Sequence, residues 1–446
     1  MHTHNTAEAS AQEPSFTCDV LVIGGGPAGS SIATLLARKG RNVHLLEKAH
    51  HPRFHIGESL LPANARLFDE LGVREQVEAV GMPKWGVEFV SPDHDHQSYL
   101  EFKDALDKSQ PYAWQVRRAD LDELLFRNAS VAGAHAFEGH RVRDVHFDAD
   151  GAQAQVERDD GSRSTWRCRY VVDASGRDTL LANKFKSKRK HPGHNSSALF
   201  GHFRNARRLE GMKEGSITIF WFEHGWFWFI PLADGTTSVG AVVWPYYLKS
   251  RDTPMPEFFR RTIAMCPQLA DRLQEATLVD EQVHATGNYS YLADHCVSER
   301  YVMLGDAFAF IDPVFSSGVY QAMSTAFAAL PLIEVTLEHG PARTAKERAA
   351  FERFARKGPA EFSWFIYRVT NPTMREFFMG PRNLLRMREA VLSVLAGDIH
   401  GRTAFRLPLN LFKTLYYLVS FANPMRTWGA WRRRQRNIRP MEPAAS

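Results

Sequence analysis

The sequence predicts an α/β fold in which a domain of the Rossmann type is interleaved with a second, β-sheet domain and is followed by a helical C-terminal region. Three observations predict this fold. An apolar run at 18–23 leads directly into a glycine-rich turn. Segments 216–222, 226–230 and 236–243 are rich in β-branched and aromatic residues and are separated by turn residues, as strands are. Beyond about residue 341, apolar residues recur at helical spacings.

The composition is that of a soluble globular protein. Among 446 residues, 44% are hydrophobic and 24% charged, which excludes disordered and collagen-like classes. The four cysteines lie far apart and form no C-x-x-C pair, so neither a disulfide framework nor a thiolate zinc site is encoded: Cys18, Cys168, Cys266 and Cys296. We assign no metal and expect a reducing, cytoplasmic location.

The charge is concentrated at the end of the chain. The net charge is +5, and residues 426–446 hold six arginines against Glu442, which already accounts for that excess. The rest of the chain is neutral, so we expect no nucleic-acid partner. The longest apolar stretch, Leu411 to Ala422, contains Lys413 and is shorter than the ~20 residues of a membrane span. Residues 1–15 are polar and lack the features of a signal peptide, so we expect a disordered tail there.

The first motif predicts a dinucleotide site. The strand at 18–23 is followed by G-x-G-x-x-G, a helical segment and a second strand that ends in Glu47. Gly24 permits the tight turn, Gly26 lets backbone N–H groups approach a pyrophosphate, and Gly29 permits close packing of helix on strand. Glu47 lies where a carboxylate accepts hydrogen bonds from ribose hydroxyls. The motif alone does not separate FAD from NAD.

Three later segments identify the dinucleotide. They are Gln115 to Asp122, which begins a helix, Val171 to Arg177, and Tyr301 to Ala307, a strand that ends in Gly-Asp. In this order they resemble the flavoprotein monooxygenase superfamily. The resemblance implies a Rossmann-type FAD-binding domain, with Asp306 on the ribityl chain and Arg118 supporting FAD.

Four further patterns resemble the flavin-dependent halogenases of that superfamily, from about residue 18 to residue 325. Residues 226–231 fit W-x-W-x-I-P and residues 310–318 fit F-x-x-P-x-x-S-x-G. Residues 57–62 (GESLLP) resemble the loop beside the flavin in that family, and Lys84 occupies the position of its catalytic lysine.

The resemblance implies a two-component enzyme. FADH₂ from a separate flavin reductase reacts with O₂, and the flavin hydroperoxide oxidises chloride or bromide to hypohalous acid. Trp226 and Trp228 separate flavin from substrate, and the backbone N–H groups of Ser317 and Gly318 hold the halide. Lys84 directs the halogen to the substrate, either as a haloamine or through a hydrogen bond, and the sequence leaves both open.

The resemblance also bears on the substrate. Halogenases of free tryptophan carry a glutamate where this chain has Phe315. This favours a phenolic, resorcinolic or pyrrolic ring, free or tethered to an acyl carrier protein. Two alternatives on the same scaffold are an aromatic hydroxylase, which would not need Lys84, and a reductase of isoprenoid or polyene double bonds.

The predicted organisation interleaves two layers. The FAD-binding domain takes 16–80, 112–190 and 285–340, the substrate domain 81–111 and 191–284, and the helical region with its basic tail 341–446. Residues 407–422 and the arginines after them allow two interpretations. They form either an amphipathic element for an anionic membrane or an acidic carrier protein, or a last helix on the core with a solvated tail.

Overall fold

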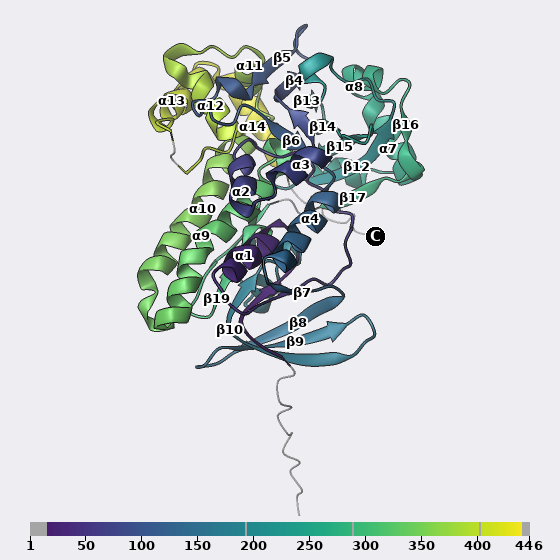
Figure 1. Ribbon diagram of the computed structural model, residues 1–446. Coiled ribbons are helices and arrows are strands. Elements are labelled where there is room, and N and C mark those ends of the chain that lie inside the picture. Colours follow the sequence, from purple (N-terminus) through teal and green to yellow (C-terminus); the bar gives the residue numbers. More distant parts are fainter. Residues whose placement is uncertain (1–15, 192–193, 288–289, 401–402, 439–446) are drawn as a thin grey trace, which may run out of the picture.

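The computed structural model describes residues 16–191, 194–287, 290–400 and 403–438. Two large sheets, one above the other in Figure 1, form the frame, and helices pack on both. The predicted α/β fold class is confirmed. Among the described residues, no helix is both long and apolar enough to cross a lipid bilayer.

The lower sheet has a parallel centre. In spatial order its strands are β7 (His135–Phe137), β2 (Val43–Leu46), β1 (Phe16–Ile23) and β10 (Arg163–Asp173), and β19 (Tyr301–Met303) pairs with the last residues of β10. Strands β1 and β2 are almost wholly buried, as expected for parallel strands covered on both faces. The helices around them are α1 (Pro27–Arg38), α4 (Arg118–Val131), α9 (Gly318–His339) and α10 (Ala345–Ile366), and α1 packs against both α4 and α9.

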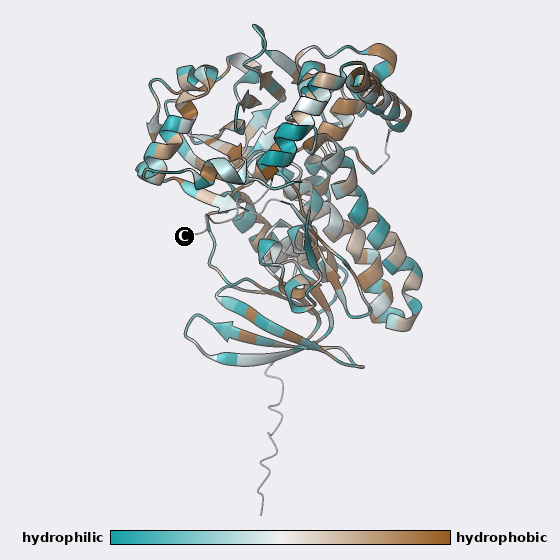
Figure 2. Cartoon of the chain, turned by 180° about the vertical axis from the view of Figure 1, so that it is seen from behind, coloured by the Kyte–Doolittle hydropathy of each residue, from teal (hydrophilic) through white to brown (hydrophobic). Residues whose placement is uncertain are grey.

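A hairpin extends the lower sheet. Strands β9 (Ala152–Arg158) and β8 (His140–Phe147) continue it in the antiparallel sense from the first half of β10. Their residues alternate between buried and exposed, which appears as alternating brown and teal in Figure 2. This is the pattern of strands with one solvated face.

The upper sheet has eight strands. In spatial order they are β16 (Thr277–Leu278), β12 (Ser197–Arg204), β15 (Thr237–Val243), β14 (Gly225–Pro231), β13 (Ile217–Phe222), β4 (Gly86–Val90) and β5 (Ser98–Glu101), with β17 (His284–Gly287) also on β12. Helices α7 (Met255–Ala264) and α8 (Pro267–Arg272) cover one face. Strand β13 runs parallel to β4. The predicted FAD-binding segment 112–190 lies between these two strands in the sequence, so the upper sheet is built from segments before and after it.

The other face of the upper sheet is covered by C-terminal helices. They are α11 (Pro372–Met379), α12 (Met387–Leu395), α13 (Arg406–Ala422) and α14 (Pro424–Ile438), and the first three share an apolar cluster with the sheet and the end of α10. The remaining helices and strands are short: α2 (Asn64–Leu71), α3 (Arg74–Val80), α5 (Leu180–Lys184), α6 (Pro245–Lys249), β3 (Met82–Lys84), β6 (Ala113–Gln115), β11 (Lys188–Lys190), β18 (Tyr291–Ala293) and β20 (Ala309–Phe310).

Candidate active site

A cavity of about 680 Å³ lies where the two sheets meet. It is lined by the ends of β1 and β2, the turn after β10, three residues of β14 and the start of α9. Nine of the eleven sequence-predicted site residues line it, and they are Gly24, Gly26, Glu47, Arg118, Trp226, Trp228, Asp306, Ser317 and Gly318. Gly29 and Lys84 do not.

The glycine-rich turn is tightly constrained. Gly24 has φ +102°, and a Cβ atom there would lie 2.4 Å from the carbonyl oxygen of Ala174. A Cβ atom on Gly29 would lie 1.9 Å from the carbonyl oxygen of Gly24, so Gly29 packs α1 against the turn instead of facing the cavity. Gly26 precedes the N-terminus of α1, where free N–H groups and the helix dipole favour an anion such as a pyrophosphate.

Glu47, which directly follows β2, holds the glycine-rich turn in place. Its two carboxylate oxygens accept hydrogen bonds from the backbone N–H groups of Gly25 (2.7 Å) and Ala49 (2.9 Å). The oxygen that accepts from Ala49 has a second lone pair, which leaves capacity for a ribose hydroxyl. Arg53, which sequence reasoning missed, donates to Glu47 (3.4 Å) and to Asp122 (3.2 Å).

Arg118 begins α4 and is held in one orientation. It donates to both carboxylate oxygens of Asp122, at 2.9 and 3.1 Å, and to the carbonyl oxygen of Ile56 at 3.0 Å. Burial opposes the charge of Asp122, but Arg118 outweighs it and lowers the pKa of that carboxyl. Arg118 therefore fixes the loop at 53–57 against α4 on the cavity wall.

Asp306 follows β19 and points a carboxyl group at the cavity. Burial raises its pKa to about 6, although Arg177 and Arg118 act in the opposite direction. In the described part of the chain nothing donates a hydrogen bond to this carboxylate, which suits it to a hydroxylated ligand such as a ribityl chain. Together with the glycine turn, this is a cavity that fits FAD.

Trp226 and Trp228 lie on one face of β14. Their side chains are buried, their ring centroids are 6.1 Å apart, and the indole N–H of Trp228 donates to the Ser238 hydroxyl at 3.1 Å. Gly240 on β15 leaves room for the Trp228 ring, since a Cβ atom there would lie 2.2 Å from it. The two indoles form a rigid wall between the cavity and the apolar cluster.

Ser317 and Gly318 lie at the N-terminus of α9. The turn before them places Ser316 in the left-handed region, with φ +56°. The Ser317 hydroxyl accepts a hydrogen bond from the Gln321 side chain at 3.0 Å. The first N–H groups of a helix have no acceptor within it, so those of α9 are available to an anion at the cavity.

Lys84 is the last residue of β3 and is 2% exposed. Its ammonium group donates to the Ser59 hydroxyl and to the carbonyl oxygen of Leu60, both at 2.9 Å, and lies 5.2 Å from the Phe102 ring. Burial lowers its pKa to about 7. Ser59 lines the cavity, so its hydroxyl stands between the cavity and the lysine.

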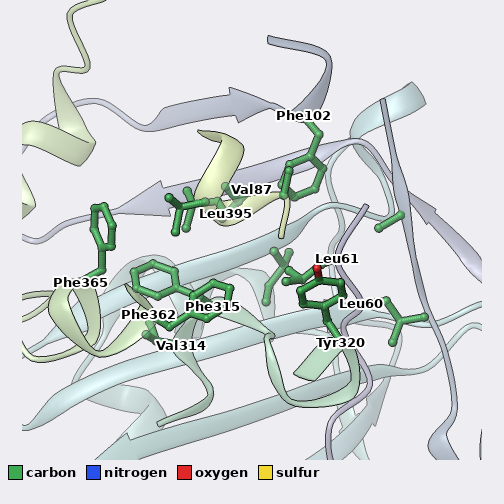
Figure 3. Close-up of a cluster of buried hydrophobic side chains, with 14 of the residues drawn as sticks. Leu60, Leu61, Val87, Phe102, Val314, Phe315, Tyr320, Phe362, Phe365 and Leu395 are labelled. Carbon is green, nitrogen blue, oxygen red and sulfur yellow. The ribbon is translucent and has the colours of Figure 1, made fainter. Parts of the chain in front are cut away.

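An apolar cluster adjoins Lys84. Figure 3 shows Phe102 and Leu60, which lie near the lysine, in one cluster with Phe315, Phe362 and Phe365. Phe315 is buried there, with its ring centroid 6.0 Å from that of Phe365. Phe315, on which the expectation about the substrate rests, therefore lies in an apolar environment.

Sequence reasoning missed a buried pair on the cavity wall. A ring nitrogen of His202 lies 2.8 Å from one carboxylate oxygen of Glu58, and the other oxygen of Glu58 is buried without a partner among the described residues. The two residues are 144 positions apart, so only the early motif around Glu58 gave any signal.

The chain matches the FAD binding domain family over residues 17–346. It is 36% identical over 330 residues to a tryptophan 2-halogenase of Chondromyces crocatus, covering 71% of this chain and 61% of that protein. It is 33% identical over 352 residues to a flavin-dependent halogenase of Armillaria mellea, covering 73% and 69%. The chain spans 65% of a flavin-dependent halogenase of Penicillium aethiopicum, so it is clearly shorter than several curated relatives.

Solved structures give the same family. The myxobacterial chondrochloren halogenase is 32% identical with a TM-score of 0.75, covering 88% of this chain and 92% of that one. A flavoprotein/dehydrogenase from Cytophaga hutchinsonii is 28% identical with a TM-score of 0.84, covering 91% and 100%. FAD is thus the cofactor that the fold accommodates, and the chain belongs to the family of FAD-dependent halogenases.

Proposed function

We propose that the protein is a two-component, FADH₂- and O₂-dependent halogenase of electron-rich aromatic rings. FAD, once reduced by a separate flavin reductase, supplies the oxidising chemistry with O₂. The observation that carries the proposal is the buried Lys84, which has no carboxylate partner among the described residues. It contacts the cavity wall through Ser59.

Two groups of cavity residues bind two different anions. Gly24, Gly26 and the N-terminus of α1 hold the FAD diphosphate, and the N–H groups of Ser317 and Gly318 hold chloride or bromide at the N-terminus of α9. Trp226 and Trp228 close the wall toward the apolar cluster, which keeps the ring to be halogenated away from the flavin.

Lys84 acts on the hypohalous acid. A pKa of about 7 gives it both a neutral amine, which accepts electrophilic halogen, and an ammonium donor, which orients hypohalous acid by a hydrogen bond. Ser59 and the carbonyl group of Leu60 hold the nitrogen in place. The apolar surroundings exclude water, which would otherwise compete with the substrate.

The ring to be halogenated is phenolic, resorcinolic or pyrrolic, free or tethered to a carrier protein. Phe315 supports this choice because it contributes a buried phenyl ring where a carboxylate would bind a charged amino acid. A relative of 36% identity is named a tryptophan 2-halogenase, so free tryptophan belongs among the substrates tested.

The decisive experiment separates halide oxidation from transfer. Photoreduced FAD, O₂ and bromide are supplied with resorcinol, a phenol, free tryptophan and a carrier-tethered pyrrole, and free hypobromous acid is trapped with a thiol. Lys84→Met should abolish brominated product while trapped hypobromous acid persists, because methionine fills the same space without an amine.

Lys103→Met is the matched control, since Lys103 is exposed and close in sequence. It should brominate as the wild type does. A Lys84→Met enzyme that keeps its product yield and regioselectivity would refute the role of Lys84. Oxygenated product without bromide dependence would indicate an aromatic hydroxylase instead.

A further inference from the structure

Helix α13 is apolar on two opposite sides. One side packs on the core through Leu409, Phe412 and Tyr416, which are buried. The opposite side exposes Leu407, Leu418 and Phe421, with 71%, 61% and 86% of their surfaces accessible. A last helix that only covered the core would be polar on this side. In Figure 1, α13 lies at the outer edge of the molecule.

Helix α14, which contacts α13, also exposes apolar side chains. Met425, Trp428 and Trp431 recur every three residues and are 88%, 54% and 54% exposed. Phe421 and Met425 flank the turn between the helices and are the most exposed of the set. We call these side chains the α13–α14 face, defined as Leu407, Leu411, Leu418, Phe421, Met425, Trp428 and Trp431.

The two helices themselves carry charge of one sign. Residues 406–438 contain seven arginines and lysines and no aspartate or glutamate. Arg426 and Lys413 pair with acids on neighbouring helices, and the Arg432 guanidinium lies 3.3 Å from the centre of the Trp428 ring. Arg433 and Arg436 are exposed.

We propose that the α13–α14 face docks the protein on an anionic lipid surface, with Phe421 and Met425 inserted and the arginines at the headgroups. Indole rings prefer the boundary between headgroups and acyl chains, and basic side chains are attracted to anionic lipids. A second copy fits less well, because a two-fold interface would bring two acid-free basic segments together. This inference concerns binding to a lipid surface and does not depend on the proposed halogenation.

The test is sedimentation of the full-length protein with vesicles. The vesicles contain phosphatidylcholine alone or equal parts of phosphatidylcholine and phosphatidylglycerol. We expect binding to the anionic vesicles to be about tenfold stronger or more, and weaker at high salt, because the arginines are screened. The variant Phe421→Ser/Met425→Ser should lose binding, and Arg433→Gln/Arg436→Gln should lose the preference for anionic lipid.

The matched control is Val131→Ser/Met212→Ser, which removes two side chains that are 87% and 68% exposed elsewhere. It should bind vesicles as the wild type does. The proposal is overturned if wild-type protein ignores anionic vesicles, or if the Phe421/Met425 variant binds them equally. It is also overturned if light scattering finds a dimer that this variant dissociates, or if the face binds an acidic carrier protein but no lipid.

Discussion

The Lys84 side chain is buried away from water and, among the described residues, has no carboxylate partner. Burial favours its neutral form, so its pKa falls to about 7 and the amine titrates within the working range of the protein. The contacts with Ser59 and Leu60 keep the nitrogen in place in both forms.

We expect the yield of halogenated product per hypohalous acid formed to rise with pH through about 7 and then level off. The physical reason is that the neutral amine, which accepts halogen, becomes the main form above this pH. Product and trapped oxidant are measured across the range. A profile without an inflection there contradicts the assignment, and a fall with pH assigns the active form to the ammonium donor.

Asp306 carries a second pH dependence, in the protein without FAD. Its pKa is raised from 3.8 to about 6, so between these values the folded state keeps a proton that the unfolded state has lost, and stability declines as the pH rises from about 4 to about 6. Asp306→Asn should therefore raise the free energy of unfolding above pH 6 by roughly 3 kcal/mol, and much less below pH 4.

Urea unfolding below pH 4 and above pH 6 measures this difference. Asp280→Asn, which changes an exposed carboxylate, is the control and should show no such dependence. An equal effect of Asp306→Asn at acid and neutral pH would show that Asp306 is not held in the uncharged form. The same variant should bind FAD more weakly, because it replaces the charged acceptor.

At the scale of elements, we expect the turn before α9 to decide where the proposed halide site lies. Ser316 has φ +56°, a conformation that costs a β-branched residue about 1–2 kcal/mol. Ser316→Val should displace the first turn of α9 and raise the KM for bromide about tenfold, while the affinity for FAD changes little.

Ser316→Gly is the control, because glycine adopts this conformation freely. Its KM for bromide should stay near that of the wild type. Steady-state rates against bromide concentration and FAD titrations by fluorescence supply the two readouts. Equal KM values for the valine and glycine variants would refute the dependence on the turn.

Local sequence patterns predicted the positions of individual strands well, but they did not predict which residues of different segments contact each other. Strands predicted at 216–222, 226–230 and 236–243 correspond to β13, β14 and β15, because alternation and β-branched residues act within one segment. The pairings of Arg53 with Glu47 and Asp122, and of His202 with Glu58, depend on which segments meet in space. The predicted domain boundary at 285 falls inside β17, whose pairing with β12 no local pattern reveals.

The same limit applies to the candidate site. Most of its residues could be named from motifs, because glycines, indoles and the Gly-Asp pair have fixed roles in a turn or strand end. The contact of Ser59 with Lys84 could not, because the two residues lie on separate strands or loops and meet only through the pairing around β3 and β6. The predicted roles remain predictions until variants test them.

At the scale of the whole molecule, the cavity is assigned to FAD, and no second dinucleotide motif is available for NADH or NADPH. The sequence contains a single G-x-G-x-x-G motif. We therefore expect the isolated protein to oxidise NADH and NADPH slowly, and a flavin reductase to restore turnover. Absorbance at the nicotinamide band with and without the reductase measures this. Rapid NADPH oxidation by the protein alone would contradict it.

Helices α1 and α9 pack against each other, and both begin at the cavity, one at the glycine turn and the other at Gly318. Two helix dipoles thus add to a positive potential in one enclosed space. The FAD diphosphate and a halide at the proposed site would then share one electrostatic field, so we expect occupancy by one anion to weaken the binding of the other. A large excess of bromide should displace FAD, and the optimum halide concentration should rise with the concentration of cofactor.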